Sequence, residues 1–270
     1  MPVATETRGQ LVIIGGAEDK QGDCKILREF VRCSGGLQAQ IVVMTVATNL
    51  PGEVGSDYID VFKRLGVEDV RVIDTARRED ASEAKALEAI TNATGVFFTG
   101  GDQSRITSVL KGTELDAALH KRYAEGIVVG GTSAGASMMS ETMIVDGDAE
   151  THPRMDIVEI DSGMSFMPDA LIDQHFAQRG RLGRLISGVA KEPQLLGIGI
   201  DENTAIIVDN HQFSVIGAGA VTIVDLSEVT HTNLDSLLKD EGLAVCGAKL
   251  HILPDGYRFD MQTRQPIVNP

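Results

Sequence analysis

The sequence predicts an α/β protein built on a doubly wound, mostly parallel sheet. Between residues 11 and 130, short apolar runs rich in β-branched residues alternate with longer segments whose apolar residues recur at helical spacing. This alternation is typical of parallel strands with helices on both faces of the sheet. Three of the runs are followed by paired glycines, which favour sharp turns. Functional residues are therefore expected beyond the carboxyl ends of the strands.

The expected strands of the first half cover residues 11–14, 41–46, 70–73, 96–99 and 127–130. Apolar residues at helical spacing predict helices over 26–31, 54–65 and 82–92, the first two ended by glycine. Thr113 is the expected N-cap of a further helix, because Asp116 follows it at capping-box spacing.

The second half predicts antiparallel additions to the sheet. Short apolar segments at 143–145, 157–160, 205–208, 213–216 and 221–224 are separated by Gly, Asp and Asn turns. A helix is expected over 182–189, with Arg181 and Arg184 on one face. Residues 249–253 and 257–261, on either side of Pro254-Asp255-Gly256, are expected to form a hairpin.

Length and charge limit the classes of protein. The 270 residues suit one large α/β unit, so a single domain over 1–270 is expected. Lys and Arg number 24 against 39 Asp and Glu, a net charge of -15, which argues against nucleic-acid and anionic-membrane partners. The three cysteines, Cys24, Cys33 and Cys246, lack disulfide or zinc-site spacing, so no metal is expected. Without a signal peptide or a bilayer-length apolar run, the expected location is cytoplasmic.

The segment 127–137 places a hydroxyl between a strand and a helix. Ser133 lies among small residues after the apolar run 127–129, a pattern typical of a nucleophile on a tight strand-to-helix turn. The start of the following helix would offer free N–H groups to an oxyanion. An ordinary Gly/Ser turn explains the same residues, so the nucleophile stays a hypothesis at this point.

A serine nucleophile requires a general base with an orienting partner. Asp173, Gln174 and His175 follow the apolar run 170–172. In extended conformation His175 would share a face with Asp173, leaving Gln174 on the other. A buried structural cluster would explain this triplet equally well. The remaining histidines have settings typical of surface or cross-strand positions: His120, His152, His211, His231 and His251. For the acid, Asp201 and Glu202 both follow the apolar run 195–200, and the residues alone leave the choice open.

A basic cluster follows His175 in this acidic chain. Arg179, Arg181 and Arg184 fit either a solvated helix face or a site that binds a carboxylate through planar, bidentate contacts. A dinucleotide site at Gly15-Gly16 is excluded, because the third glycine is missing and acidic residues stand where a pyrophosphate would bind.

Five segments in order resemble the cyanophycinases, a group of serine peptidases that also contains the aspartyl dipeptidase E enzymes. The segments are 15–20 (GGAEDK), 99–103 (TGGDQ), 131–136 (GTSAGA), 173–176 (DQHF) and 197–202 (GIGIDE). The resemblance implies a class I glutamine-amidotransferase-like fold with a nucleophile elbow and a catalytic triad of Ser133, His175 and Glu202. It also implies an oxyanion site at the backbone N–H groups of Gly101 and Ala134, and a substrate pocket lined by Gln103, Asp173, Gln174, Arg179, Arg181 and Arg184.

The resemblance further implies a homodimer without metal or organic cofactor. Members cleave cyanophycin, a poly-aspartate with arginine on its side-chain carboxyls, to β-Asp-Arg dipeptides. The three arginines suit the substrate carboxylates, and Asp173 with Glu18 or Asp19 suits the guanidinium. The main alternative is a dipeptidase E-like enzyme, which the arginine cluster and the long segment after Glu202 oppose. A non-catalytic binding protein on the same fold is a second alternative. A serine at the elbow opposes a cysteine-based amidotransferase.

Overall fold

A computed structural model describes residues 9–149, 152–238 and 240–268 of the chain. Within these residues, nine strands form one sheet in the order β17-β16-β11-β10-β1-β5-β4-β2-β3. Its parallel part contains β1 (Leu11–Ile14), β5 (Val128–Thr132), β4 (Gly95–Phe98), β2 (Gln40–Met44) and β3 (Asp69–Ile73). Its antiparallel part contains β10 (Thr204–Asp209), β11 (Gln212–Gly217), β16 (Arg258–Asp260) and β17 (Gln265–Ile267).

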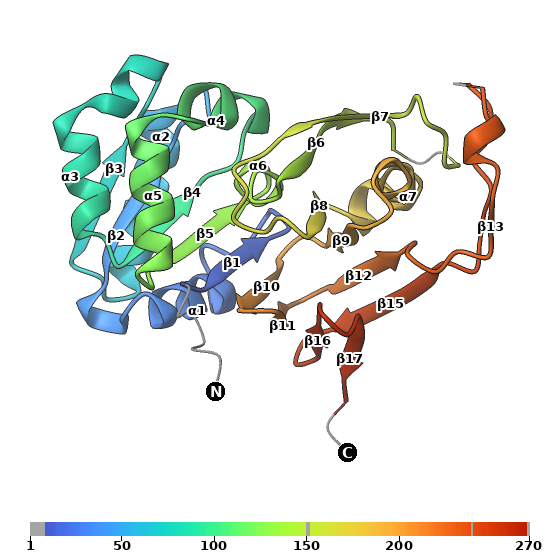
Figure 1. The fold of residues 1–270 in the computed structure, drawn as a ribbon. Helices are drawn as coiled ribbons and strands as arrows, with labels where there is room; N and C mark the ends of the chain where they lie inside the picture. The colour runs from blue at the N-terminus through green and yellow to red at the C-terminus, as the bar shows by residue number, and fades with distance from the viewer. Residues whose placement is uncertain (1–8, 150–151, 239, 269–270) are drawn as a thin grey trace, which may run out of the picture.

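Helices cover both faces of the parallel part (Figure 1). On one face α1 (Lys25–Cys33) and α2 (Pro51–Arg64) pack with Val12 and Phe97. On the other face lie α3 (Ala84–Asn92), α4 (Gln103–Leu110), α5 (Glu114–Ala124) and α6 (Ala134–Ser137), which pack with Ile13 and Phe98. Adjacent residues of one strand thus enter opposite cores, because side chains alternate across a strand. The prediction of a doubly wound α/β fold is confirmed.

A second sheet lies beside the first, with the order β15-β12-β9-β8 (Figure 1). Its strands are β8 (Ala170–Gln174), β9 (Leu196–Ile200), β12 (Ala220–Asp225) and β15 (Lys249–Pro254). Helix α7 (Leu182–Lys191) joins the parallel strands β8 and β9 and packs Leu185 and Val189 against Leu171. The segment 170–200 is therefore a further βαβ unit within a region where the sequence predicted antiparallel additions.

Smaller elements complete the described chain. Strands β6 (Thr142–Gly147) and β7 (Val158–Ser162) form an antiparallel pair, as do β13 (His231–Thr232) and β14 (Val245–Cys246). The 3₁₀ helices are η1 (Gly36–Gln38), η2 (Arg78–Ser82), η3 (Ala177–Arg179) and η4 (Leu234–Ser236). No helix in the described ranges is both long and apolar enough to cross a membrane.

The predicted hairpin at 249–261 is wrong. Strand β15 pairs with β12 in the second sheet, whereas β16 pairs with β11 and β17 in the first. The turn between them is bound to β11, because Val215 donates its N–H to Tyr257 O (2.8 Å) and accepts one from Gly256 N (2.9 Å). The chain after the turn therefore joins the sheet that contains β11.

Candidate active site

Ser133 occupies a strained turn between β5 and α6. Its backbone has φ 54° and ψ −111°, an angle pair that non-glycine residues rarely adopt. The neighbouring glycines allow this close packing: a Cβ at Gly131 would lie 2.2 Å from Gly135 O, and one at Gly135 would lie 2.4 Å from Phe98 O. The turn thus has the geometry of the predicted nucleophile elbow.

The imidazole of His175 lies between the serine and a carboxylate. Its Nε2 is 3.0 Å from Ser133 Oγ, and its Nδ1 is 2.6 Å from Glu202 Oε1. Since a carboxylate accepts the Nδ1 proton, Nε2 of the neutral ring is free to accept the serine proton. This geometry allows the imidazole to act as a general base towards the hydroxyl.

The predicted alternation across residues 173–175 is wrong. Strand β8 ends at Gln174, and His175 has φ 47°, so the backbone leaves the extended conformation at the histidine. As a result, Gln174 Oε1 lies 3.5 Å from Ser133 Oγ, on the same side as the imidazole. Asp173 instead points into a buried cluster with arginines.

The two acids of the 201–203 turn have different contacts. Asp201 is 9% exposed, and its two oxygens each accept a backbone N–H at 3.0 Å, from Ala177 and Ala220. Glu202 reaches the imidazole, and its own N–H is bound by Gln178 Oε1 at 3.0 Å. Asp201 therefore holds the loops together, while Glu202 contacts His175.

The two predicted oxyanion donors belong to segments that flank Ser133. Ala134 is the first residue of α6, a position whose N–H has no acceptor inside the helix. The glycine pair at 100–101 passes close to the serine, because a Cβ at Gly100 would lie 3.4 Å from Ser133 Cβ. Gly101 has φ 145°, and a Cβ there would meet Ala47 O at 2.1 Å.

Arg179, Arg181 and Arg184 do not form a solvated helix face, because only the first is exposed. Arg184 is 5% exposed and binds Asp173 with two nitrogens, while its Nη1 donates to Gly147 O at 3.1 Å. Arg181 is 7% exposed and donates to Gln174 O at 2.6 Å. Arg179 is exposed.

Arg181, Arg184 and Asp173 form a buried group with two positive charges and one negative charge. Its two guanidiniums, of Arg181 and Arg184, share the single carboxylate of Asp173. Burial lowers the pKa of Arg181 to about 10, with Asp173 opposing that effect and the other arginines adding to it. The buried Nε of Arg181 meets no hydrogen-bond acceptor among the described residues.

Gln103 and Glu18 already have hydrogen-bond partners within the chain. Gln103 Nε2 donates to Ile144 O and Val145 O, both at 2.9 Å, and so links α4 to β6. Glu18 accepts the hydroxyls of Tyr58 and Thr132, a contact that sequence reasoning missed.

Asp19 accepts backbone N–H groups of its own loop, of which those of Cys24 and Gly22 contribute most to lowering its pKa to about 2. Neither Glu18 nor Asp19 is therefore a free ligand for a guanidinium. Across the described residues, no group of three or more His, Cys, Asp or Glu side chains could hold a metal ion.

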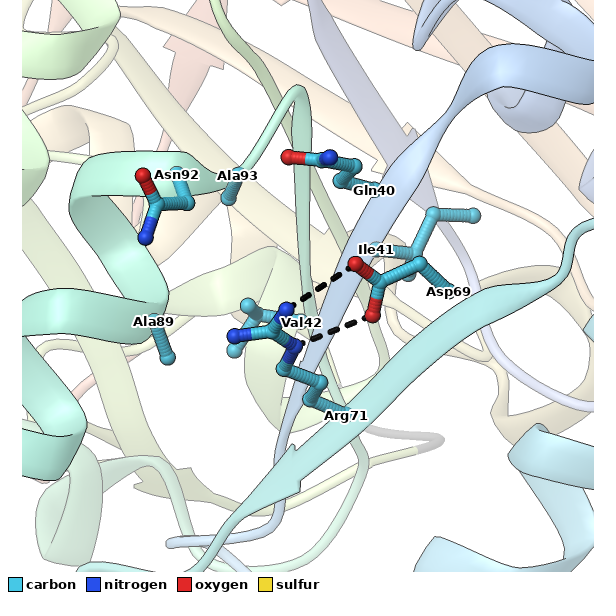
Figure 2. Close-up of a pocket in the computed structure, with 8 residues that line it drawn as sticks. All are labelled: Gln40, Ile41, Val42, Asp69, Arg71, Ala89, Asn92 and Ala93. Atoms are coloured by element: carbon cyan, nitrogen blue, oxygen red, sulfur yellow. Dashed lines mark hydrogen bonds and ion pairs between the residues drawn. The ribbon is translucent and has the colours of Figure 1, made fainter.

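A small pocket lies where β2 and β3 begin, at the end of the parallel strands opposite to Ser133 (Figure 2). Its volume is about 10 Å³, and Arg71 and Asp69, which both line it, are bonded to each other at 2.9 and 3.0 Å. A space of this size holds about one water molecule. It therefore offers no site for a peptide.

The fold and the serine–histidine–glutamate geometry together are those of a serine-type hydrolase. Residues 11–216 match the sequence profile of peptidase family S51, and the chain belongs to that family. It is a serine-type peptidase, and the resemblance drawn from its motifs is confirmed.

Proteins similar to this chain are named cyanophycinases. Identity is 39% over 260 residues with the protein of Thermosynechococcus vestitus, covering 96% of this chain and 81% of the relative. It is 39% over 265 residues with that of Trichormus variabilis (97% and 88%) and 36% over 262 residues with that of Geminocystis herdmanii (96% and 96%).

Solved structures support the fold alone. The crystal structure of a peptidase from an acI-B1 actinobacterium matches with a TM-score of 0.68 at 18% identity, covering 94% of this chain and 98% of that one. A putative peptidase E protein from Listeria monocytogenes matches with a TM-score of 0.55 at 16% identity, covering 78% and 100%.

Proposed function

We propose that the chain is a serine exopeptidase that hydrolyses cyanophycin to β-Asp-Arg dipeptides through Ser133, His175 and Glu202. The observation that carries the proposal is the imidazole within hydrogen-bonding distance of both the hydroxyl and the carboxylate. The similarity to several cyanophycinases over almost the whole chain supports the substrate. A cytoplasmic homodimer is part of the same proposal, and light scattering of the purified protein tests the assembly.

In the proposed mechanism, Ser133 Oγ attacks a backbone carbonyl carbon of the polymer while His175 Nε2 takes the hydroxyl proton. Glu202 holds the ring and stabilises the imidazolium. The N–H groups of Gly101 and Ala134 bind the oxyanion. His175 then gives its proton to the leaving amine, which breaks the peptide bond and leaves an acyl-enzyme. Water, deprotonated by the same imidazole, hydrolyses the ester and restores the serine.

Substrate recognition follows from the charge of the pocket. Each repeat of the polymer carries a guanidinium and a carboxylate. Arg181 and Arg184 share one carboxylate, and the buried Arg181 Nε has no acceptor among the described residues. We assign Arg181 and the exposed Arg179 to the substrate carboxylate, since guanidinium groups bind carboxylates in planar geometry. Gln174 lies at the serine and would contact the reacting unit.

The side chains that already have partners would shape the pocket. Gln103, Asp173 and Arg184 do so through the contacts described above.

Mass spectrometry of soluble products from insoluble cyanophycin tests the proposal. The expected product is the β-Asp-Arg dipeptide, released from the start of the reaction without longer intermediates. Aspartyl dipeptides supplied in a parallel reaction should be cleaved far more slowly. Rapid cleavage of the dipeptides with an intact polymer would favour the dipeptidase E-like alternative, and no cleavage of either would favour a binding protein.

A further inference from the structure

The last residue of β1 and the loop that follows it, residues 15–20, together contact the backbone of every proposed catalytic segment. Consecutive carbonyl oxygens at the end of β1 and the start of this loop each accept one backbone N–H: Ile14 O from Ser133 N (3.1 Å), Gly15 O from His175 N (2.8 Å) and Gly16 O from Asn203 N (2.8 Å). The last donor is adjacent to the proposed acid. Three segments that are distant in the sequence thus take their positions from one short stretch of chain.

Close packing at the two glycines makes this arrangement sensitive to small movements. A Cβ at Gly16 would lie 2.3 Å from Cε1 of His175, so the imidazole rests directly on the backbone of the loop. A Cβ at Gly15 would lie 2.1 Å from Asp201 O. Any displacement of the loop is therefore transmitted to the imidazole and to the turn that carries the acid.

Glu18 fixes this loop to the residue before the serine. Its side chain is 2% exposed, and its Oε2 accepts the hydroxyl of Thr132 at 2.6 Å. Its Oε1 accepts the hydroxyl of Tyr58, with Lys20 Nζ at 3.8 Å. Burial and the Glu18 carboxylate raise the pKa of Tyr58 well above its ordinary value, so the phenol stays a donor. The carboxylate therefore joins the loop to β5 on one side and to α2 on the other.

We propose that Glu18 and Thr132 are positioning residues, and that their hydrogen bond sets the distance between Ser133 Oγ and His175 Nε2. The inference rests on the proposed function, because it concerns the same serine and histidine. The histidine is attached to the loop and the serine to β5, so a bond between loop and strand fixes one relative to the other. Both oxygens of Glu18 accept hydroxyls of this chain and the side chain is 2% exposed, so we assign it no contact with substrate. Loss of alignment, with binding intact, lowers kcat and leaves KM unchanged.

The test is a steady-state comparison of Thr132→Val with the parent protein on cyanophycin. Valine keeps the shape and removes the hydroxyl, so we expect kcat to fall about tenfold while KM stays within about twofold. Thr132→Ser should restore kcat to within about threefold of the parent. Glu18→Gln should lower kcat to a similar extent, and the Thr132→Val/Glu18→Gln double variant should be no worse than the poorer single variant.

Thr142→Val is the matched control, because Thr142 also donates to a glutamate, Glu192 Oε1 at 2.9 Å, outside the loop and the elbow. Its kcat should equal that of the parent. Parental kcat in Thr132→Val, or failure of Thr132→Ser to restore it, would overturn the inference. If Thr132→Val does not fold, Glu18→Gln and Tyr58→Phe decide by the same kcat and KM criteria. A Ser133→Ala variant run alongside separates the two claims. If Ser133→Ala keeps its activity, the proposed function is refuted. If Ser133→Ala is inactive and Thr132→Val has the kcat of the parent, only the positioning role is refuted.

Discussion

Arg184 binds both carboxylate oxygens of Asp173, with Nε 2.9 Å from Oδ2 and Nη2 2.6 Å from Oδ1, and the two side chains are 5% and 1% exposed. Asp173 directly precedes Gln174 and His175 in the chain, and the third nitrogen of Arg184, Nη1, donates to Gly147 O. A carboxylate bound in this way keeps the end of β8 in place. Arg184 is thus buried and stabilises the fold, whereas Arg179 is exposed.

The first prediction separates these two arginines. Arg184→Met removes the bidentate hydrogen bonds to Asp173 and leaves Arg181 as its ion-pair partner, so unfolding in urea should show a loss of about 2–3 kcal/mol, as expected for lost hydrogen bonds to a buried charged group. Arg179→Met should leave stability within about 0.5 kcal/mol and should raise KM for cyanophycin. Equal stability of the two variants would show that the Asp173 contact carries no folding free energy.

The second prediction separates the two acids of the 201–203 turn. Glu202→Gln should lower kcat by about 10²–10⁴-fold, because an amide cannot stabilise the imidazolium. Asp201→Asn loses one of two backbone contacts, so it should cost about 1–3 kcal/mol of stability and leave kcat close to that of the parent. Steady-state kinetics and urea unfolding of both variants check this. The reverse assignment would follow if Asp201→Asn were the inactive protein.

The third prediction concerns Gly16. Gly16→Ala places a methyl group against the His175 ring at a backbone φ of 100°, so activity should fall at least about 100-fold. Gly36→Ala is the control, because it has φ 65° with no atom within 4 Å of the added Cβ. It should cost about 1–2 kcal/mol from backbone strain and keep full activity. Similar kinetics of the two variants would refute the close contact with the imidazole.

The fourth prediction is a pH dependence of stability that arises at His120. The Asp116 carboxylate, 3.3 Å from Nε2, raises the pKa of His120 above its ordinary value, against the opposing effect of burial. Its contribution to stability is therefore complete below the unfolded-state pKa and is lost as pH rises through the folded-state pKa. Replacement by glutamine should cost more stability at about pH 5 than at about pH 8.5. Urea unfolding of both proteins at the two pH values measures this, and an equal or larger cost at the higher pH would contradict it.

Local patterns predicted the first half of the fold because each strand and helix there is specified by its own residues. The runs at 11–14 and 96–99 and the cap at Thr113 correspond to β1, β4 and the start of α5. Helix α4 was not predicted, since 103–110 is rich in hydroxyl residues, although Asp102 does cap it by accepting Ser104 N–H. The hairpin at 249–261 failed because the partners of β15 and β16 are distant in the sequence.

Some residues of the candidate site could be predicted from the sequence, and others could not. The small residues around Ser133 indicated the turn directly, and the structure has it. Spacing alone left Asp201 and Glu202 equivalent, because the distinction depends on how the turn at 201–203 meets His175. The burial of Arg184 was not predictable, since a 3₁₀ turn at 177–179 folds α7 back onto β8.

The central claim is that Ser133 is the nucleophile, and the most direct measurement is cyanophycin turnover by Ser133→Ala beside Ser137→Ala. Both serines lie in the elbow region. Ser137 is buried in α6, and among the described residues its side chain has no hydrogen bond to the imidazole. With folding verified by circular dichroism, Ser133→Ala should lose at least about 10³-fold in kcat, and Ser137→Ala should stay near the parent. Release of β-Asp-Arg by Ser133→Ala within about tenfold of the parent rate would contradict the account.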